Sequence, residues 1–137
     1  MAVSLLCVGL LGLLVFLLGA NVSRVRQSVA VTQHEDEANP ESSLRKAIRA
    51  HGNCIEYVPM LSLMILAIGL AIPMLVSKWI VGLMFAAVAS RYIHAIGILT
   101  GGSVYAGNPL KTIGAVGTYV TGAALSVILI VRAAGLF

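Results

Sequence analysis

At the polar opening of a long apolar run, the chain reads Arg49-Ala-His51-Gly-Asn53-Cys54-Ile-Glu56-Tyr57-Val-Pro59. Successive residues of an α-helix are rotated by about 100°, so Arg49, Asn53 and Glu56 fall on one narrow face. A cation, an amide and a carboxylate therefore form one stripe, and the next formal charge is Lys78. A carboxylate at the mouth of a membrane-length segment is costly unless it is paired, so this stripe is a candidate functional site.

The composition around this stripe is that of an integral membrane protein. Of the 137 residues, 59% are hydrophobic and 10% are charged, and the mean hydropathy is +0.99. Soluble domains carry about 25% charged residues. The length admits about four spans of roughly 20 residues each, with little left for a soluble domain. The net charge of +4 comes from cations that flank apolar segments without forming a compact basic patch, so no nucleic-acid partner is expected.

The apolar segments predict an all-α fold, a four-helix transmembrane bundle that forms a single domain over residues 1–137. Residues 1–22 carry no charge and lack the basic region that opens a secretory signal, so we expect a transmembrane helix that is retained. Gly114 and Gly117 in the last segment favour close approach of a neighbouring helix. The four expected helices cover about residues 1–23, 40–77, 79–99 and 110–134.

The second segment has a recognisable start and two internal prolines. Asn39-Pro40-Glu41 is typical of a helix beginning, with a capping amide, a proline in the first turn and an acid beside it. Pro59 and Pro73 are expected inside this helix, where each leaves the backbone carbonyl four residues earlier without its hydrogen-bond partner. Residues 27–43, which contain the Glu35-Asp36-Glu37 run, are predicted to form a solvated loop.

Flanking cations indicate how the chain is oriented in the bilayer. Five basic residues flank the first loop and Lys111 follows the third, whereas Lys78 and Arg132 lie on the other side. The positive-inside rule then predicts that the first and third loops are cytoplasmic and that both termini are outside.

Glu56 and Arg91 are the ionisable groups nearest the hydrocarbon, and two interpretations of them stay open. Charges within a membrane nearly always find partners, so the simpler interpretation is an ion pair within one subunit or between two. The same cluster could also hold a small zwitterionic ligand. Asn53 could serve only to cross-link helices. A lone histidine such as His94 is more often a hydrogen-bonded structural residue than a ligand. His51 is expected to face lipid headgroups or another helix. No metal-ligand spacing, nucleophile triad or nucleotide-binding loop is present in the sequence.

The run from Asn39 to Pro59 resembles the signature of the MAPEG family, the membrane-associated proteins of eicosanoid and glutathione metabolism. The family pattern Arg-Ala-(His/Gln)-x-Asn-x-x-Glu-Tyr-x-Pro is met at every position from Arg49 onward, and Arg91-Tyr92-Ile93-His94 is similar to its third-helix motif. The short loops are most similar to the small bacterial branch. The resemblance implies a left-handed four-helix bundle assembled as a homotrimer in a bacterial inner membrane.

The resemblance also implies that glutathione binds as co-substrate between neighbouring subunits, near the cytoplasmic boundary. An arginine at the end of the first helix contributes to that site in the family, and its counterpart here would be Arg24 or Arg26. His94, which belongs to the third-helix motif, is included among the candidates. The remaining residues expected to contact glutathione are Arg49, Asn53, Glu56, Tyr57, Arg91 and Tyr92.

One position departs from the family pattern. Catalytic members activate the glutathione thiol with an arginine at the start of the fourth helix, but here Lys111 is the only cation between Arg91 and Arg132. Lysine supplies a point charge without the planar fork of arginine. Lys111, with Tyr105 or Tyr92 expected near it in the bundle, is therefore the remaining candidate to favour a thiolate.

Two functions follow from these residues. The leading interpretation is a glutathione-binding membrane protein of the transferase or peroxidase type, acting on small lipophilic electrophiles that enter from the bilayer. The alternative is a non-catalytic scaffold or lipid-binding trimer, because the family also contains the non-catalytic lipoxygenase-activating protein. A small transporter is a third class, which the lack of paired repeats with broken helices disfavours.

Overall fold

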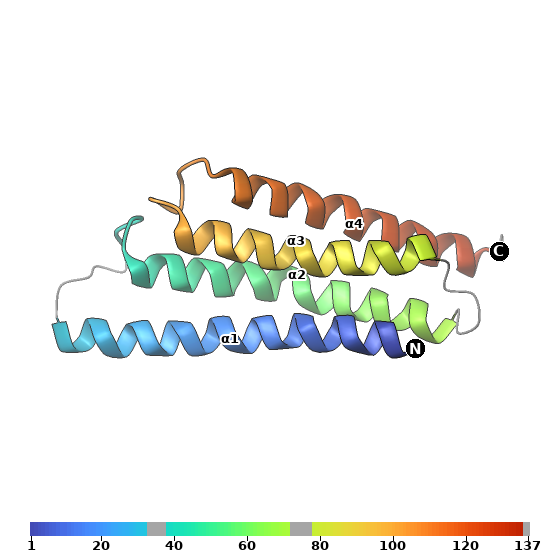
Figure 1. Cartoon of the computed structure of the whole chain (residues 1–137), viewed down its shortest axis with the longest axis horizontal. Helices are drawn as coiled ribbons and strands as arrows, with labels where there is room; N and C mark the ends of the chain where they lie inside the picture. The colour runs from blue at the N-terminus through green and yellow to red at the C-terminus, as the bar shows by residue number, and fades with distance from the viewer. Residues whose placement is uncertain (33–37, 72–77, 136–137) are drawn as a thin grey trace.

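The computed structural model describes residues 1–32, 38–71 and 78–135, and these residues form a bundle of four α-helices. Each helix is long and apolar enough to cross a membrane, which confirms the predicted fold class of the chain as an integral membrane protein. Figure 1 shows the helices side by side, with both termini at one end and the α3–α4 connection at the other, hereafter the loop end. The helices are α1 (Ala2–Thr32), α2 (Ser43–Ala71), α3 (Lys78–Thr100) and α4 (Pro109–Ala133).

Helix α1 continues to Thr32, so the prediction that it ends near residue 23 is wrong. The two arginines after that point are exposed and do not interrupt the helix. Val25 continues the buried apolar face and packs against Leu44 and Ala47 of α2 in a small second core. Burial of this face stabilises helix beyond the charge-free segment, and the predicted loop over 27–43 is correspondingly too long at its start.

Helix α2 begins at Ser43 and not near Pro40 as predicted. The Ser42 hydroxyl accepts a hydrogen bond at 3.0 Å from a backbone amide of the first turn, so Ser42 caps the helix. The Asn39 side chain instead closes a local turn, accepting from the amide two residues later at 3.0 Å. The Pro40 carbonyl accepts from the Val104 amide at 2.9 Å, which ties this turn to the α3–α4 connection.

Helix α2 continues through Pro59 to its described end at Ala71. The predicted end of this helix at residue 77, the effect of Pro73 and the acidic run Glu35-Asp36-Glu37 lie outside the described residues.

Glycines bring α3 and α4 into close contact. A Cβ atom at Gly97 would collide with the backbone of Lys111, and one at Gly114 with the backbone of His94. The predicted small-residue contact of α4 is thereby confirmed at Gly114. It also fixes how the first turns of α4 sit against the last turns of α3, which is where the candidate site lies.

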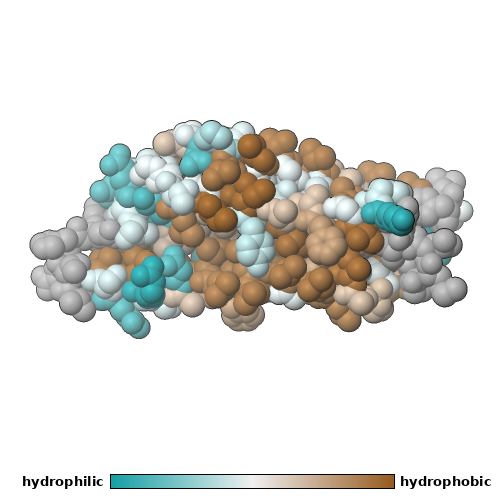
Figure 2. Space-filling model, in the orientation of Figure 1, coloured by the Kyte–Doolittle hydropathy of each residue, from teal (hydrophilic) through white to brown (hydrophobic). Residues whose placement is uncertain are grey.

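The surface of the bundle is divided along its length. Figure 2 shows an apolar band over the middle of the molecule, with hydrophilic side chains gathered toward the loop end. Large apolar side chains are exposed along the helices, among them Phe16 of α1 at 78% and Ile130 of α4 at 67%. This pattern places the loop end at a boundary between hydrocarbon and water.

Candidate functional site

A cavity of about 300 Å³ lies at the loop end among α2, α3 and α4, and we call it the polar cavity. Arg49 and Asn53 reach it from α2, His94 from α3 and Lys111 from the first turn of α4. Three helices thus bring two cations, an amide and an imidazole to one place. Its remaining wall consists of Ile98, Val104, Thr112, Ala115 and Val116.

Lys111 is positioned by the cap of α4. The Asn108 side chain accepts from the Lys111 amide at 3.3 Å, and Pro109 occupies the first helical turn. The Lys111 ammonium group donates to the carbonyls of Val104 at 3.0 Å and Ala106 at 2.7 Å. An ammonium group has three N–H donors, so one is left for another partner.

Both histidines of α2 and α3 serve contacts between helices. Nδ1 of His94 lies 2.7 Å from the carbonyl oxygen of Lys111, and only 7% of the residue is exposed. A carbonyl can only accept, so Nδ1 carries the hydrogen, and in the neutral ring Nε2 is an acceptor. The expectation of a hydrogen-bonded structural His94 is confirmed, and the residue also lines the polar cavity. His51 faces α1 at Gly19, in agreement with the expected contact to another helix.

Arg91 is the largest fully buried side chain among the described residues, with 1% of the residue exposed. Its Nη2 donates to the Asn53 side-chain oxygen at 2.7 Å and to the Asn53 carbonyl at 3.2 Å. Its Nη1 donates to the Thr118 hydroxyl at 3.4 Å. A buried guanidinium is therefore held by neutral acceptors on α2 and α4, and it cross-links three helices.

Glu56 pairs with Arg49, so the predicted direct pair of Glu56 with Arg91 within one chain is wrong. The carboxylate lies 3.9 Å from Nη1 of Arg49, and both side chains are about half exposed, at 52% and 56%. Asn53 lies between the charges, because its Nδ2 donates to Glu56 at 3.4 Å while its oxygen accepts from Arg91. A pair of Glu56 with Arg91 of a neighbouring subunit stays a prediction.

Two tyrosines extend this cluster toward the middle of the bundle. The hydroxyl groups of Tyr57 and Tyr119 are 3.1 Å apart, and the rings meet edge to face with centroids 5.8 Å apart. The Arg91 guanidinium lies 5.1 Å from the centre of the Tyr57 ring, a cation–π contact. Thr118 and Tyr119 were not among the predicted site residues. The available signal was the presence of hydroxyl groups inside an apolar span, where each needs a partner.

Two further cavities follow the polar cavity toward the apolar surface, and each shares lining residues with the one before it. A junction cavity of about 20 Å³, enough for one water molecule, is lined by Asn53 and His94 on one side and by Tyr57, Thr118 and Tyr119 on the other. Beyond it lies an apolar groove of about 210 Å³ between α2 and α4. The groove is lined by Tyr57, Met60, Leu61, Met64, Thr118, Tyr119, Gly122, Ala123 and Ser126.

Comparison with known protein families shows to which family the chain belongs. The model described as MAPEG family matches residues 4–131, nearly the whole chain. The chain belongs to the MAPEG family. No curated protein and no solved structure matches it significantly. The resemblance inferred from Arg49–Pro59 is thus confirmed, and the MAPEG family includes membrane proteins related to glutathione.

Seven predicted site residues do not line the polar cavity of this MAPEG protein. Three of them lie next to it, since Tyr57 and Arg91 line the junction cavity and Glu56 pairs with Arg49. The other four lie elsewhere. The Tyr92 hydroxyl donates to the Leu10 carbonyl at 2.8 Å, so it ties α3 to α1. Arg24 lines a different cavity, on the side of α1. Arg26 is exposed on α1, and Tyr105 is 77% exposed because the α3–α4 connection turns its side chain outward. Within one chain these residues therefore do not join Arg49 and Asn53.

Thiols and metal ligands are sparse in the described part of this MAPEG protein. Cys7 and Cys54 are unpaired and buried. Over residues 1–32, 38–71 and 78–135, no group of three His, Cys, Asp or Glu side chains is placed to hold a metal ion.

Proposed function

We propose that this MAPEG protein binds glutathione in the polar cavity and joins it, through its sulfur, to a lipophilic electrophile that enters from the bilayer. The observation that carries the proposal is the series of cavities described above, from a polar cavity at the loop end to an apolar groove in the span. Asn53 and His94 are common to the polar and junction cavities, and Tyr57 and Tyr119 to the junction cavity and the groove. A water-soluble thiol and an apolar partner could meet at this junction.

The polar groups of the cavity complement glutathione, which carries two carboxylates, an amino group and two peptide bonds. Arg49 and the free donor of Lys111 suit the carboxylates, and Asn53 suits a peptide group. Glu56 does not line the cavity but pairs with Arg49 beside it, and its carboxylate suits the amino group. Arg91 was predicted to bind a carboxylate directly. Its buried contacts to Asn53 and Thr118 instead support a positioning role behind the ligand.

A neighbouring subunit would complete the site. We propose a homotrimer in a bacterial inner membrane with the loop end in the cytoplasm, on the basis of family membership and of the cations that gather there. Arg26 is exposed on α1 and is the better candidate to reach across a subunit boundary, because Arg24 lines a cavity within its own chain.

The transfer itself needs a glutathione thiolate at neutral pH. The sulfur would form a bond to the electrophilic carbon while the leaving group departs with its electron pair. Lys111 supplies positive charge at one side of the polar cavity, and the hydroxyl groups of Tyr57 and Tyr119 supply donors at the junction. Hydrogen bonds from such donors favour the charged form of the sulfur.

A non-catalytic scaffold or lipid-binding trimer is the second candidate, and one observation favours it. Two of the three donors of Lys111 are already bonded to backbone carbonyls of the α3–α4 connection. That geometry fits a residue that stabilises a loop as well as one that stabilises a thiolate.

Glutathione-dependent thioether formation in the purified protein separates the two functions. The protein in lipid nanodiscs is mixed with glutathione and an aryl halide, and the product is followed by absorbance. Arg49→Gln should raise the KM for glutathione about tenfold, since a charge-assisted hydrogen bond contributes about 1.5–3 kcal/mol. Arg45→Gln removes the same charge from α2 outside the polar cavity and should leave the KM unchanged. Absence of glutathione-dependent product in the wild type would favour the scaffold.

A further inference from the structure

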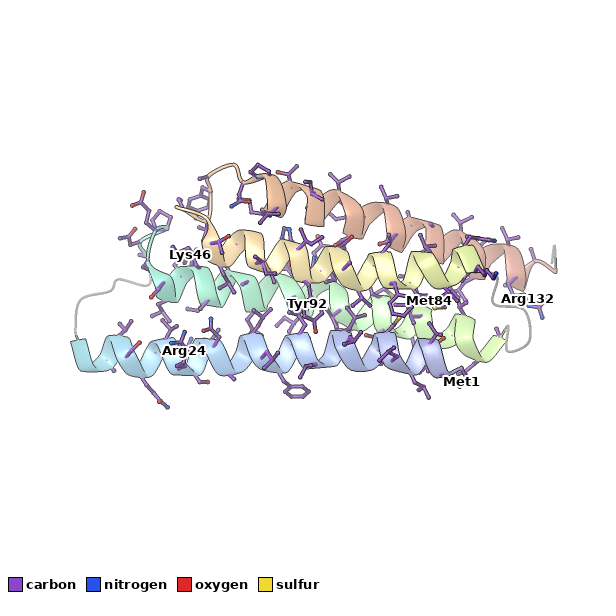
Figure 3. All side chains as sticks on the ribbon, in the orientation of Figure 1. Met1, Arg24, Lys46, Met84, Tyr92 and Arg132 are labelled. Atoms are coloured by element: carbon purple, nitrogen blue, oxygen red, sulfur yellow. The ribbon has the colours of Figure 1, made fainter. Side chains whose placement is uncertain are left out.

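A second cavity at the loop end, of about 290 Å³, lies on the side of α1, and we call it the α1 cavity. It shares no lining residue with the polar cavity. Figure 3 shows Arg24 and Lys46 at the same level on the facing helices α1 and α2. The cavity is lined by Asn21, Arg24, Val25, Ser43, Lys46 and Leu99.

Both cations of the α1 cavity are oriented by a hydrogen bond within the protein, and both have further N–H donors available. Nη2 of Arg24 donates to the Asn21 side-chain oxygen at 2.9 Å, and the Lys46 ammonium donates to the Gly101 carbonyl at 3.2 Å. Neither cation lies within 4.0 Å of a carboxylate in the described part of the chain. A guanidinium has five N–H donors and an ammonium three, so most donors stay available to an anion. Two neighbouring cations without an acid favour a ligand that carries negative charge.

The level of the α1 cavity in the bilayer indicates which anion fits. The charge-free part of α1 before Arg24 is 22 residues long, which is about 33 Å of helix and matches a hydrocarbon core of roughly 30 Å. Arg24 therefore lies where lipid phosphates lie. Leu17 and Leu13 precede it by seven and eleven residues, so they share its helix face. Both are exposed, at 55% and 51%, and they lead from the cavity into the apolar band.

We propose that the α1 cavity binds the phosphate group of an anionic phospholipid. The phosphate oxygens accept hydrogen bonds from Arg24 and Lys46, and an acyl chain lies along Leu17 and Leu13. The volume equals that of about ten water molecules at roughly 30 Å³ each, which leaves room for a phosphate with bound water. A zwitterionic headgroup fits less well, because its ammonium would lie beside two cations and none of the described residues that line the cavity is acidic. The free phosphate ion shares the recognition chemistry but makes no use of the apolar face.

The test is native mass spectrometry of the full-length protein released from detergent micelles. The micelles contain phosphatidylglycerol in one sample and phosphatidylcholine in a second, and a third sample holds inorganic phosphate without added lipid. We compare Arg24→Gln/Lys46→Gln with Arg26→Gln/Arg45→Gln. The second pair removes the same charge from the same two helices, outside the α1 cavity. Arg26 is two residues beyond Arg24 and so points to the opposite side of α1.

The wild type should retain phosphatidylglycerol at least tenfold better than phosphatidylcholine. Each lost charge-assisted hydrogen bond corresponds to about a tenfold change. The first variant pair should therefore bind the anionic lipid at least tenfold more weakly, while the second binds as the wild type does. Arg24→Lys/Lys46→Arg keeps both charges and should retain the lipid, which separates recognition from a folding defect.

Three results would overturn the proposal. Equal loss in both variant pairs would mean that general charge attraction retains the lipid. Equal retention of the two lipids would mean that the phosphate charge is not recognised. Retention of inorganic phosphate in the absence of anionic lipid, with no gain from the lipid, would mean that the cavity is a site for a soluble anion.

Discussion

The contact between Asn53 and Arg91 is the interaction on which the candidate site depends most, and Asn53→Leu tests it. The substitution keeps the branched shape of the side chain and removes the oxygen that lies 2.7 Å from Nη2 of Arg91. Arg91 is 1% exposed and keeps only the Asn53 carbonyl and Thr118 as hydrogen-bond acceptors among the described residues, beside its cation–π contact with Tyr57. Its Nε has no hydrogen-bond partner there. Hydrogen bonds between membrane helices contribute about 0.6 kcal/mol on average and up to about 1.7. Hydrogen bonds to a buried cation lie at the upper end of these contributions or above it. We therefore expect Asn53→Leu to lower the free energy of unfolding by about 2 kcal/mol.

A double-mutant cycle with Arg91→Met isolates this contact. Unfolding of purified protein in mixed micelles is measured for the wild type, the two single variants and the double variant. We expect the double variant to lose about 2 kcal/mol less free energy of unfolding than the two single variants lose in sum. The reason is that removing both partners leaves no unpaired buried cation. A parallel cycle of Glu56→Gln with Arg91→Met should be nearly additive. Additivity for Asn53 and strong coupling for Glu56 would refute the reasoning and restore a direct ion pair, across subunits.

Three further predictions concern packing, the α4 lysine and orientation. Gly97→Ala should destabilise the protein by about 1–3 kcal/mol through overpacking. Gly82→Ala should not, because a Cβ atom there meets open space. Equal melting temperatures of the two variants would contradict the close approach of α3 and α4. Lys111→Met should speed amide hydrogen exchange in the α3–α4 connection and lower turnover more than glutathione affinity, and unchanged exchange would show that the lysine does not anchor the loop. In a background without native thiols, Ser103→Cys should react with an impermeant maleimide from the cytoplasm and Ala134→Cys from outside, and the reverse labelling would overturn the orientation.

The fold was predictable because hydrophobic runs of membrane length leave few alternatives to helices. The ends of the helices were less predictable, for physical reasons. Arg24 was expected to mark the end of the first helix, but a cation at an interface does not break a helix, and packing of Val25 against Leu44 continues it. The cap of α2 was assigned to Asn39, whose side chain closes a turn, while Ser42 has the capping geometry.

The candidate site was predictable along one helix and not between helices. Helical spacing places Arg49, Asn53 and Glu56 together, and the structure bears this out through the contacts that join them. Spacing along α2 does not specify how α3 and α4 are rotated about their own axes. The partner of Arg91 was therefore wrongly inferred from charge alone, and Tyr119 was missed as the partner of Tyr57.

Isothermal titration calorimetry of glutathione into the purified protein in nanodiscs addresses the polar cavity directly. We predict a saturable heat at millimolar glutathione or below that is lost in Arg49→Gln and kept in Arg45→Gln. Arg49 lines the cavity and Arg45 does not, although both lie near the start of α2. Absence of a saturable heat for the wild type, or equal heats for the two variants, would contradict glutathione binding in the polar cavity.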